Sequence, residues 1–541
     1  MVEVERRFEV APRFSLPDLA RCVPTGGRVV SEPAATLRST FLDTADLRLA
    51  RAGATLCHRG DDDALPWSLT LPRTSVAGEG LEIARAAVPT PGRSRRPAAT
   101  IPADLVALVT VYARGVTLAP AVTIRTGRTR YELRDRDDVL LAEVVDDLVA
   151  VLDDRRVLDR FREIAVIDRA GRPKVIRRLG TALTTAGAVE HDGTPRQIRA
   201  MASVPRLAGL VTTPADLRPA PSTLGRKANA ADAVTAALRT DIGRILHHDP
   251  LVRLGRQEGA SGSATAAATS GEADPIHGMR VGVRRLRSTL RQFAPLFADD
   301  AGDRAAALAD ELRWLGRVLG QARDAEVIRA RLRRVADADP ACPLDAASIA
   351  RIDAELTARD EEAGTALVEA LASPRYQALV DRLVGTASAP AFRPVAARRA
   401  DALLPRFVAR GWHRLTYGRH GLDGAADLDA TTPDAQWHTA RTRVRWVRYA
   451  VEVTQPVIGV PAAELAAALT AVSDVLGAHR DAVLAATAWL DIAASDPDDH
   501  ALAVTAGRLM ERERAAARAA ADAYPATWRA VVGAHLTAWL P

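Results

Sequence analysis

The sequence predicts a multidomain α+β protein, with an N-terminal antiparallel β tunnel or barrel that carries helices and a C-terminal part made of helical bundles. Two observations predict this division. Short runs of alternating residues, separated by Gly, Pro and Asp, fill about the first 200 residues, as is typical of β-strands. Beyond residue 223 apolar residues recur at helical spacing, and one helical pattern occurs twice. The chain has 541 residues, which is more than one core usually serves.

Composition limits the classes of protein to which the chain can belong. A formal net charge of +6 is small for this length, so any site for a polyanion must be local. The three cysteines, Cys22, Cys57 and Cys342, lie far apart, which supports neither a disulfide framework nor a cysteine zinc site. No run of about 18 apolar residues occurs and the first residues lack an apolar signal core, so we expect a cytoplasmic protein without a membrane partner.

The first expected strand, residues 2–10, sets the sense of the sheet. Its charged residues Glu3, Glu5 and Arg7 share one face, while its apolar residues lie mostly on the other. An apolar outer face and a charged inner face suit a barrel with a polar lumen. Seven further strands are expected near residues 37–43, 54–60, 66–72, 80–87, 121–133, 139–151 and 160–168.

Four short motifs follow one another in this region. They are Glu-x-Glu-x-Arg-Phe at residues 3–8, Phe41-Leu-Asp-Thr-Ala-Asp-Leu-Arg-Leu, Trp67-Ser-Leu-Thr-Leu and Phe161-Arg-Glu163. In this order they resemble the CYTH family of triphosphate tunnel enzymes, over a domain that we place at residues 1–204. The resemblance implies an antiparallel tunnel that holds a triphosphate between basic side chains and divalent metal ions carried by glutamates.

The resemblance also implies roles for individual residues. Glu3 and Glu5 would be catalytic, with Mg²⁺ or Mn²⁺ as cofactor, because hard cations prefer oxygen ligands. The candidate metal ligands are Glu3, Glu5, Glu82, Glu143, Asp147 and Glu163. The candidate triphosphate contacts are Arg7, Arg38, Arg59, Arg125, Arg128 and Arg130. Arg128 and Arg130 share a face from which Arg125 points away, so a β-bulge is needed for all three to face inward.

Three departures from the family pattern bear on activity rather than on fold. Cys57 stands in place of the first arginine of the family's Leu-Arg-x-Arg strand, and Pro72 stands where a lysine is usual. Ala165 and Ile167 replace alternating glutamates of the late acidic strand. Phosphoryl transfer depends on positioning and charge neutralisation, so we expect weak hydrolysis, or binding without cleavage.

Two segments are expected to lie outside the packed elements. Four prolines within residues 205–221 predict a linker at residues 205–222. Residues 255–275 are rich in Gly, Ser, Ala and Thr, which predicts a flexible loop before the next helix.

The helix expected from residue 277 to residue 293 carries two stripes. Its apolar residues recur every three or four positions and form a packing face. A basic stripe lies one position further round the helix and consists of His277, Arg280, Arg284, Arg287 and Arg291. About 160 residues later the pattern returns with His438, Arg441, Arg445 and Arg448. Each copy is followed by Leu-Gly-x-x-Arg-Asp, at residues 319–324 and 476–481.

These doubled motifs resemble the CHAD domain, the conserved-histidine α-helical domain that binds inorganic polyphosphate as two four-helix bundles. The resemblance covers residues 223–541, with repeats at about 223–390 and 391–541. The polyphosphate contacts it implies are Lys227, His277, Arg280, Arg284, Arg287, Arg291, Arg323, His438, Arg441, Arg445, Arg448 and Arg480. Arginine suits this role because its planar fork donates two hydrogen bonds to phosphate oxygens.

Some roles remain open at this point. The two histidines either contact phosphate or are satisfied by neighbours at a helix start. The Arg-Asp pairs of the second motif either bind phosphate or brace the groove.

Three classes of function therefore compete. The first is a polyphosphate-binding protein whose tunnel binds triphosphate or polyphosphate and weakly hydrolyses it with a divalent metal. The second is a non-catalytic binding protein associated with polyphosphate granules in the cytoplasm. The third, nucleic-acid binding, is disfavoured because no row of aromatic residues runs along the stripes to stack on bases. The sequence leaves open whether the tunnel is an enzyme.

Overall fold

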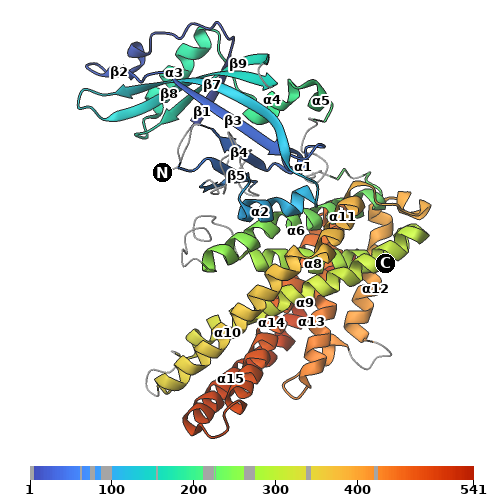
Figure 1. The fold of residues 1–541 in the computed structure, drawn as a ribbon. Coiled ribbons are helices and arrows are strands. Elements are labelled where there is room, and N and C mark those ends of the chain that lie inside the picture. Colours follow the sequence, from blue (N-terminus) through green and yellow to red (C-terminus); the bar gives the residue numbers. More distant parts are fainter. Residues whose placement is uncertain are drawn as a thin grey trace. The chain divides into compact units, whose positions relative to one another are not determined.

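The computed structural model describes residues 5–60, 64–72, 80–86, 100–153, 156–210, 224–225, 227–260, 274–336, 343–418 and 424–541, with the backbone alone at residues 257–260. The chain divides into two compact units, Met1–Ala215 and Asp216–Pro541. Figure 1 shows an antiparallel sheet with helices in the first unit and helices throughout the second. The predicted α+β fold class is confirmed.

One antiparallel sheet forms the first unit, with the strand order β10-β1-β9-β8-β7-β3-β4-β5-β6 and with β2 on β7. Among the described residues no pairing joins the two end strands, β10 and β6. The strands are β1 Glu5–Val10, β2 Arg28–Ser31, β3 Ala35–Asp43, β4 Thr55–Arg59, β5 Trp67–Leu71, β6 Leu81–Arg85, β7 Ala119–Arg134, β8 Leu140–Asp153, β9 Arg156–Asp168 and β10 Val189–Glu190. All eight expected strands occur, whereas β2 and β10 were not predicted because each is too short to carry a readable alternation.

Helices cover both faces of this sheet. They are η1 Leu19–Cys22, α1 Arg48–Ala52, α2 Ala103–Ala113, α3 Pro173–Thr185, α4 Arg196–Ala202 and α5 Pro205–Ala208. Val144 of β8 packs in one core with Leu179 of α3, while Val149 packs in another with Met201 of α4. Because Val144 and Val149 have opposite parity on a strand without a bulge between them, the two cores lie on opposite faces.

The expected linker, residues 205–222, begins with helix α5. Leu207 of α5 is buried in the same core as Met201. The two units divide within the expected linker, between Ala215 and Asp216, and residues 211–223 lie outside the described ones.

The second unit is helical throughout its described secondary structure. Its elements are α6 Ala230–Ala260, α8 Pro275–Gln292, η3 Ala294–Leu296, α9 Asp299–Ala336, α10 Ala346–Ala372, α11 Pro374–Ser388, η4 Pro394–Ala397, α12 Ala400–Tyr417, η5 Ala425–Asp427, α13 Asp434–Ile458, α14 Val460–Ala494, α15 His500–Val531 and α16 Ala534–Thr537. The first helices of the repeats, α6 and α12, begin side by side at an antiparallel bridge between Asn229 and Arg399. The duplication read from the sequence therefore relates equivalent helices.

The apolar stripes of α8 and α13 are buried, as their spacing predicts. Met279 and Val283 of α8 and Val444 and Val447 of α13 are at most 1% exposed. A further core joins the repeats, because Leu332 of α9 packs with residues of α10, α14 and α15. In Figure 1 the yellow α10 and the red α15 run side by side.

The glycine-rich segment, residues 255–275, is only partly a loop. Residues 255–260 continue α6, and α8 begins at Pro275. Asp274 caps α8, because its Oδ1 accepts a hydrogen bond from the backbone N–H of His277 at 3.1 Å. Residues 261–273 lie outside the described ones.

Helix α14 is long and apolar enough, by length and composition, to cross a membrane. The high mean hydropathy of this helix comes from its many alanines, and it has no long run of large aliphatic residues. In this fold its buried residues, among them Leu465, Leu469 and Trp489, pack within the helical unit against α13 and α15.

Candidate functional site

The basic stripes of α8 and α13 line one cavity of about 550 Å³ in the second unit, which we call the arginine cavity. Helices α9 and α14 supply the Arg-Asp pairs of the second motif to its wall. The basic residues on the wall are His277, Arg280, Arg284, Arg287, Arg313, Arg317, Arg323, His438, Arg441, Arg445 and Arg480. Among the described residues, two acidic ones, Asp324 and Asp481, line the same space.

The stripe arginines are half-buried because the basic stripe borders the packing stripe on each helix. Burial lowers the pKa of Arg284, Arg287 and Arg441. Burial, followed by the charge of Arg441 and Arg284, lowers the pKa of Arg445 to about 9. All four therefore remain cationic at neutral pH, although removal from water and mutual repulsion oppose their charge.

Four of these arginines have no acidic partner. Among the residues that the structure describes, no carboxylate lies within 4 Å of a guanidinium nitrogen of Arg284, Arg287, Arg441 or Arg445. The Nε atoms of Arg284 and Arg441 are buried without any hydrogen-bond acceptor. A buried donor without an acceptor costs about 1–3 kcal/mol, so the cavity is arranged to be completed by an anion.

Other predicted polyphosphate contacts are held by protein carboxylates. Arg280 donates to Asp324 at 2.9 Å, and Arg323 pairs with Asp274 and, at 3.1 Å, with Glu326. Asp324 thus fixes Arg280 at the cavity wall, which is a bracing role. In the second repeat Asp481 lines the cavity, and its charge acts on Arg441 from beyond salt-bridge distance.

Three predicted contacts do not line the arginine cavity. Lys227 is exposed and precedes α6. Arg291 lies at the end of its stripe, 3.9 Å from Asp310, and Arg448 pairs with Glu452 at 3.4 Å.

Two wall residues, Arg313 and Arg317, were not predicted. They lie one turn apart on α9, and the charge of Arg313 contributes to the lowered pKa of Arg287. Their four-residue spacing, just before the second motif, was the only signal in the sequence.

Both stripe histidines are neutral at pH 7. Burial, and then the charges of Arg284 and Arg323, lower the pKa of His277. Burial, and then the charges of Arg480 and Arg445, lower the pKa of His438. In this state each ring offers one N–H donor to an anion in the cavity.

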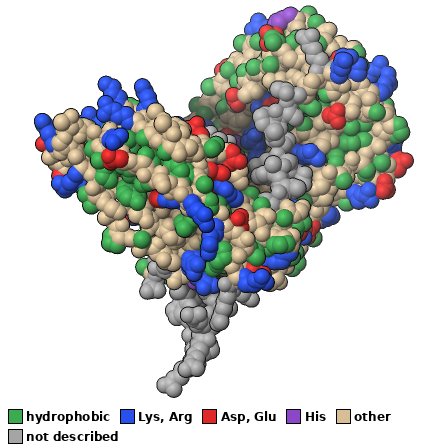
Figure 2. All heavy atoms as spheres, turned by 90° about the horizontal axis from the view of Figure 1, so that it is seen from above, with side chains coloured by type: hydrophobic (Ala, Val, Ile, Leu, Met, Phe, Trp, Pro, Cys, Tyr) green, Lys and Arg blue, Asp and Glu red, His purple; other side chains and the backbone are tan. Residues whose placement is uncertain are grey.

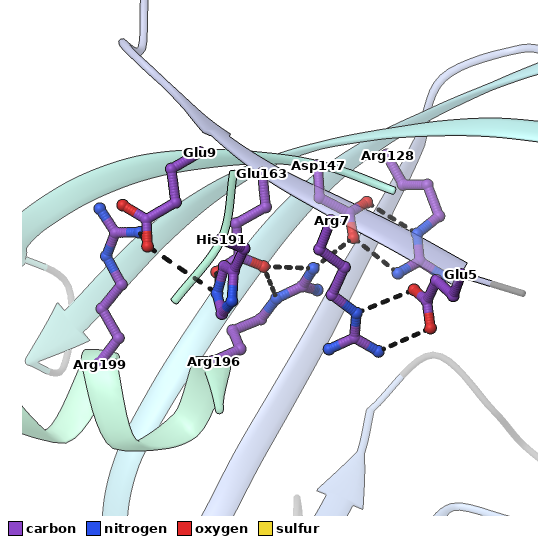
Figure 3. Close-up of polar contacts among 9 residues, drawn as sticks. All are labelled: Glu5, Arg7, Glu9, Arg128, Asp147, Glu163, His191, Arg196 and Arg199. Atoms are coloured by element: carbon purple, nitrogen blue, oxygen red, sulfur yellow. Dashed lines mark hydrogen bonds and ion pairs between the residues drawn. The ribbon is translucent and has the colours of Figure 1, made fainter. Parts of the chain in front are cut away.

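The first unit has a charged sheet face, which is defined by strand register. Glu9 on β1 pairs with Glu163 on β9, which pairs with Asp147 on β8, which pairs with Arg128 on β7. Residues directly opposite in a sheet point to the same side, so these four side chains share one face with Glu5 and Arg7. Figure 3 shows them together with residues of α4.

The predicted triphosphate arginines divide between the two faces of the sheet. Arg7, Arg59, Arg128 and Arg130 lie on the charged face. Arg38 and Arg125, which are register partners, lie on the opposite face. The ladder of β7 and β8 is regular from residue 123 to residue 133, so no bulge turns Arg125 inward.

Of the predicted metal ligands, Glu3 lies outside the described residues. Each of the other five forms an ion pair with an arginine. The pairs are Glu5–Arg7 at 2.9 Å, Glu82–Arg59 at 2.8 Å, Glu143–Arg169 at 2.8 Å, Asp147–Arg128 and Asp147–Arg196 at 2.7 Å, and Glu163–Arg196 at 2.8 Å. Arg196, at the start of α4, was not predicted to take part.

The guanidinium of Arg196 occupies the position between two buried carboxylates where a metal ion shared by them would lie. It bridges Asp147 and Glu163, which are 2% and 5% exposed (Figure 3). Burial opposes the charge of Asp147, but hydrogen bonds from Arg128 and the charge of Arg196 lower its pKa overall. As they stand, these carboxylates fit arginine rather than a divalent metal ion.

A second group with metal-ligand chemistry lies beside them. Glu9, His191 and Asp192 bring ligand atoms within 4.8 Å of one another. The Nδ1 atom of His191 accepts a hydrogen bond from the backbone N–H of Gly193 at 2.9 Å, so the neutral ring carries its proton on Nε2. The Nε2 atom lies 3.8 Å from Oε1 of Glu9 and 3.9 Å from Oε1 of Glu163, and a nitrogen that carries a proton has no lone pair for a cation.

Comparison with known families and relatives bears mainly on the helical unit. Residues 236–491 match the model of the CHAD domain, so this part of the chain is a CHAD domain. Two uncharacterized proteins of Mycobacterium tuberculosis are each 25% identical over 504 residues, covering 89% of this chain and 87% of each relative.

Two solved structures are also similar. PptA from Streptomyces chartreusis is 24% identical, with a TM-score of 0.45 over 56% of this chain and 100% of that chain. The CHAD domain from the plant Ricinus communis is 25% identical, with a TM-score of 0.41 over 57% of this chain and 96% of that chain.

Proposed function

We propose that the helical unit binds inorganic polyphosphate in the arginine cavity. The observation that carries the proposal is the group of half-buried arginines, Arg284, Arg287, Arg441 and Arg445, none of which forms an ion pair with a carboxylate of the described residues. The CHAD match supports a polyphosphate-binding role in general.

The arrangement suits a linear polyanion. Each repeat contributes one stripe, so phosphates along a chain meet guanidinium groups from α8 on one side and from α13 on the other. Arginine forks donate two hydrogen bonds to one phosphate and keep their charge at any physiological pH. Each charge-assisted hydrogen bond contributes about 1.5–3 kcal/mol, so a few such contacts give tight binding.

The test is polyphosphate binding by the full chain, measured by calorimetry in EDTA. Arg284→Ala combined with Arg445→Ala is expected to weaken binding about 100-fold, because two charge-assisted contacts are lost. Arg304→Ala combined with Arg333→Ala removes the same charge from α9 outside the cavity and should leave binding unchanged. Equal affinities of the two double variants would refute the cavity assignment.

For the first unit we propose triphosphate binding on the charged sheet face. Arg7, Arg59, Arg128 and Arg130 lie there together, which supports the proposal. We expect hydrolysis with Mg²⁺ or Mn²⁺ to be weak, because the carboxylates available to a metal ion are engaged by arginines. The alternative is a purely binding protein associated with polyphosphate granules in the cytoplasm.

Phosphate release from triphosphate and from long polyphosphate, with Mg²⁺, Mn²⁺ or EDTA, distinguishes these alternatives. Glu5→Gln is expected to abolish any metal-dependent release and to leave polyphosphate binding by the helical unit intact. Full activity of Glu5→Gln would show that the charged sheet face is not the active site. No release under any condition would favour the granule-associated binding protein.

A further inference from the structure

A second cavity of about 690 Å³ lies beside the arginine cavity in the helical unit, and we call it the aromatic cavity. Its wall is formed by the end of α8, by η3, by α12 and by the face of α13 that points away from Arg441 and Arg445. Its lining includes the apolar residues Phe407, Trp446 and Pro295 and the basic residues Arg291, Arg410, Arg414 and Arg443. Arg291 and His438 of the basic stripes reach it, but its aromatic residues Phe407 and Trp446 belong to neither recurrent motif.

The two cavities meet along one row of α13. His438, Thr442 and Trp446 line both of them. These residues are four positions apart, so they form a single ridge along the helix. A ligand that crosses this ridge has one end in a cavity where Phe407 lies among basic side chains, and the other end in the arginine cavity.

Trp446 differs from the other tryptophan of its helix. It is 40% exposed, whereas Trp437, at a packing position of the same helix, is 3% exposed. The backbone at Trp446 is held in place, because its carbonyl accepts a hydrogen bond from Nε2 of Gln292 at 2.5 Å. Leaving a large aromatic surface in water is unfavourable, so an exposed ring on a fixed backbone beside a cavity is suited to a planar ligand.

The opposite wall offers a second aromatic surface. Phe407 of α12 is held against Phe293, with ring centroids 5.4 Å apart, and the Arg410 guanidinium lies 5.9 Å from the Phe407 ring. Unsubstituted polyphosphate has no group that would use either ring. The aromatic cavity therefore favours a ligand that joins a flat heterocycle to a phosphate chain.

We propose that the paired cavities bind a nucleoside polyphosphate, with the base in the aromatic cavity and the phosphates in the arginine cavity. This proposal rests on the proposed polyphosphate site, because the phosphate chain of the ligand uses the same arginines. The base stacks on Trp446, and the sugar crosses the ridge at Thr442 and His438. Stacking of one base on an aromatic side chain contributes roughly 1–3 kcal/mol, so the nucleoside part should increase affinity measurably.

The experiment compares ATP with inorganic triphosphate by calorimetry on the full chain, in EDTA so that neither is hydrolysed. The same titrations on Arg284→Ala combined with Arg445→Ala measure any binding to the charged sheet face, and only the binding that this double variant loses is assigned to the paired cavities. ATP is expected to bind about tenfold more tightly than inorganic triphosphate. Trp446→Ala should remove the difference in affinity between ATP and inorganic triphosphate, and Trp446→Phe should restore most of that difference. Trp314→Ala is the matched control, because Trp314 is a partly exposed tryptophan of α9 that lines neither cavity.

The possible outcomes distinguish failure of the base site from failure of the polyphosphate site on which it rests. If inorganic triphosphate binds and ATP binds no better, or if Trp446→Ala weakens both equally, the base site is refuted while the phosphate site stands. If neither ligand binds, or if Arg284→Ala combined with Arg445→Ala leaves both affinities unchanged, the phosphate site itself fails and the base site fails with it.

Discussion

His277 and His438 couple the charge of the arginine cavity to pH. Their pKa values are lowered in the free protein by burial and by neighbouring arginines, so both rings are neutral at pH 7. A bound polyanion screens those arginines and raises both values, so binding takes up protons. Affinity for polyphosphate is therefore expected to increase as the pH falls into the range where these histidines take up protons.

This coupling is measured by calorimetry of polyphosphate binding at constant salt between about pH 5.5 and pH 8. Replacing both histidines with glutamine should flatten the profile, because the arginines themselves do not titrate in this range. A wild-type affinity that does not change with pH would contradict the coupling.

Asp241 makes the stability of the helical unit depend on pH. Burial raises its pKa to about 6, despite a 2.9 Å bond from Arg285, which also pairs with Glu452. The folded value lies above the unfolded value of about 3.9, so the folded state binds a proton that the unfolded state has lost. The stabilisation is full below about pH 4 and is lost as the pH rises through about 6.

Asp241→Asn cannot titrate, so it is expected to remove this part of the pH dependence. The stability difference between wild type and the variant should change by up to about 3 kcal/mol between pH 4 and pH 7. Denaturant unfolding followed by circular dichroism checks it. Parallel pH profiles of the two proteins would assign the dependence to other groups.

At the residue scale, the alternation of residues along a strand predicted which face of the sheet a side chain occupies, but not which residue it pairs with. It placed Glu5 and Arg7 on one face of β1 and Phe8 and Val10 on the other, as the register shows. It did not predict Arg196 as the partner of Asp147 and Glu163, because α4 reaches the sheet through tertiary packing that no local spacing encodes.

Helix α4 places Arg196 against two buried carboxylates of the charged sheet face. Arg196→Ala removes the guanidinium that bridges Asp147 and Glu163, so that Asp147 keeps its pair with Arg128 while Glu163 loses its arginine partner. The variant is expected to bind Mn²⁺ more tightly than wild type and to release phosphate from triphosphate faster, because a divalent ion can then take the vacated position.

Mn²⁺ binding followed by electron paramagnetic resonance, together with phosphate release, tests this prediction. Arg160→Ala is the control, because it removes an exposed arginine of β9 that lies away from these carboxylates. If Mn²⁺ affinity is the same in both variants, α4 does not obstruct a metal site.

In the helices of the second unit, residue periodicity predicts which faces are buried but not which ion pairs form. A spacing of three and four residues fixes which face of α8 packs, so the buried stripe and the adjoining arginine stripe follow from sequence. The sequence treats the two repeats as equivalent, yet Asp324 pairs with Arg280 whereas Asp481 stays beyond salt-bridge distance of Arg441. Such asymmetry arises from packing between the repeats, which no single-helix pattern contains.

At the scale of the whole molecule, the face drawn in Figure 2 carries Lys and Arg side chains in separate groups among acidic and apolar ones. This agrees with the small net charge of +6 and with a polyanion site confined to one cavity. The division into a sheet and a helical unit was predictable because the two periodicities differ, while the mutual neutralisation of arginines and carboxylates on the sheet was not.

A confined site of this kind gives a specific salt dependence. The logarithm of a polyanion affinity falls linearly with the logarithm of salt concentration, with a slope of roughly −0.7 to −0.9 per neutralised contact for nucleic acids. Each unpaired cavity arginine that is removed should therefore reduce the slope by about one contact. Arg287→Ala is expected to do so, whereas Arg448→Ala is expected to change the slope little, since Arg448 lies outside the cavity and pairs with Glu452. The two residues belong to equivalent stripes and are indistinguishable by sequence pattern, so titrating both variants with polyphosphate at several salt concentrations tests the structure directly. Equal reductions in slope would mean that Arg448 also contacts polyphosphate, and the binding site would then extend beyond the arginine cavity.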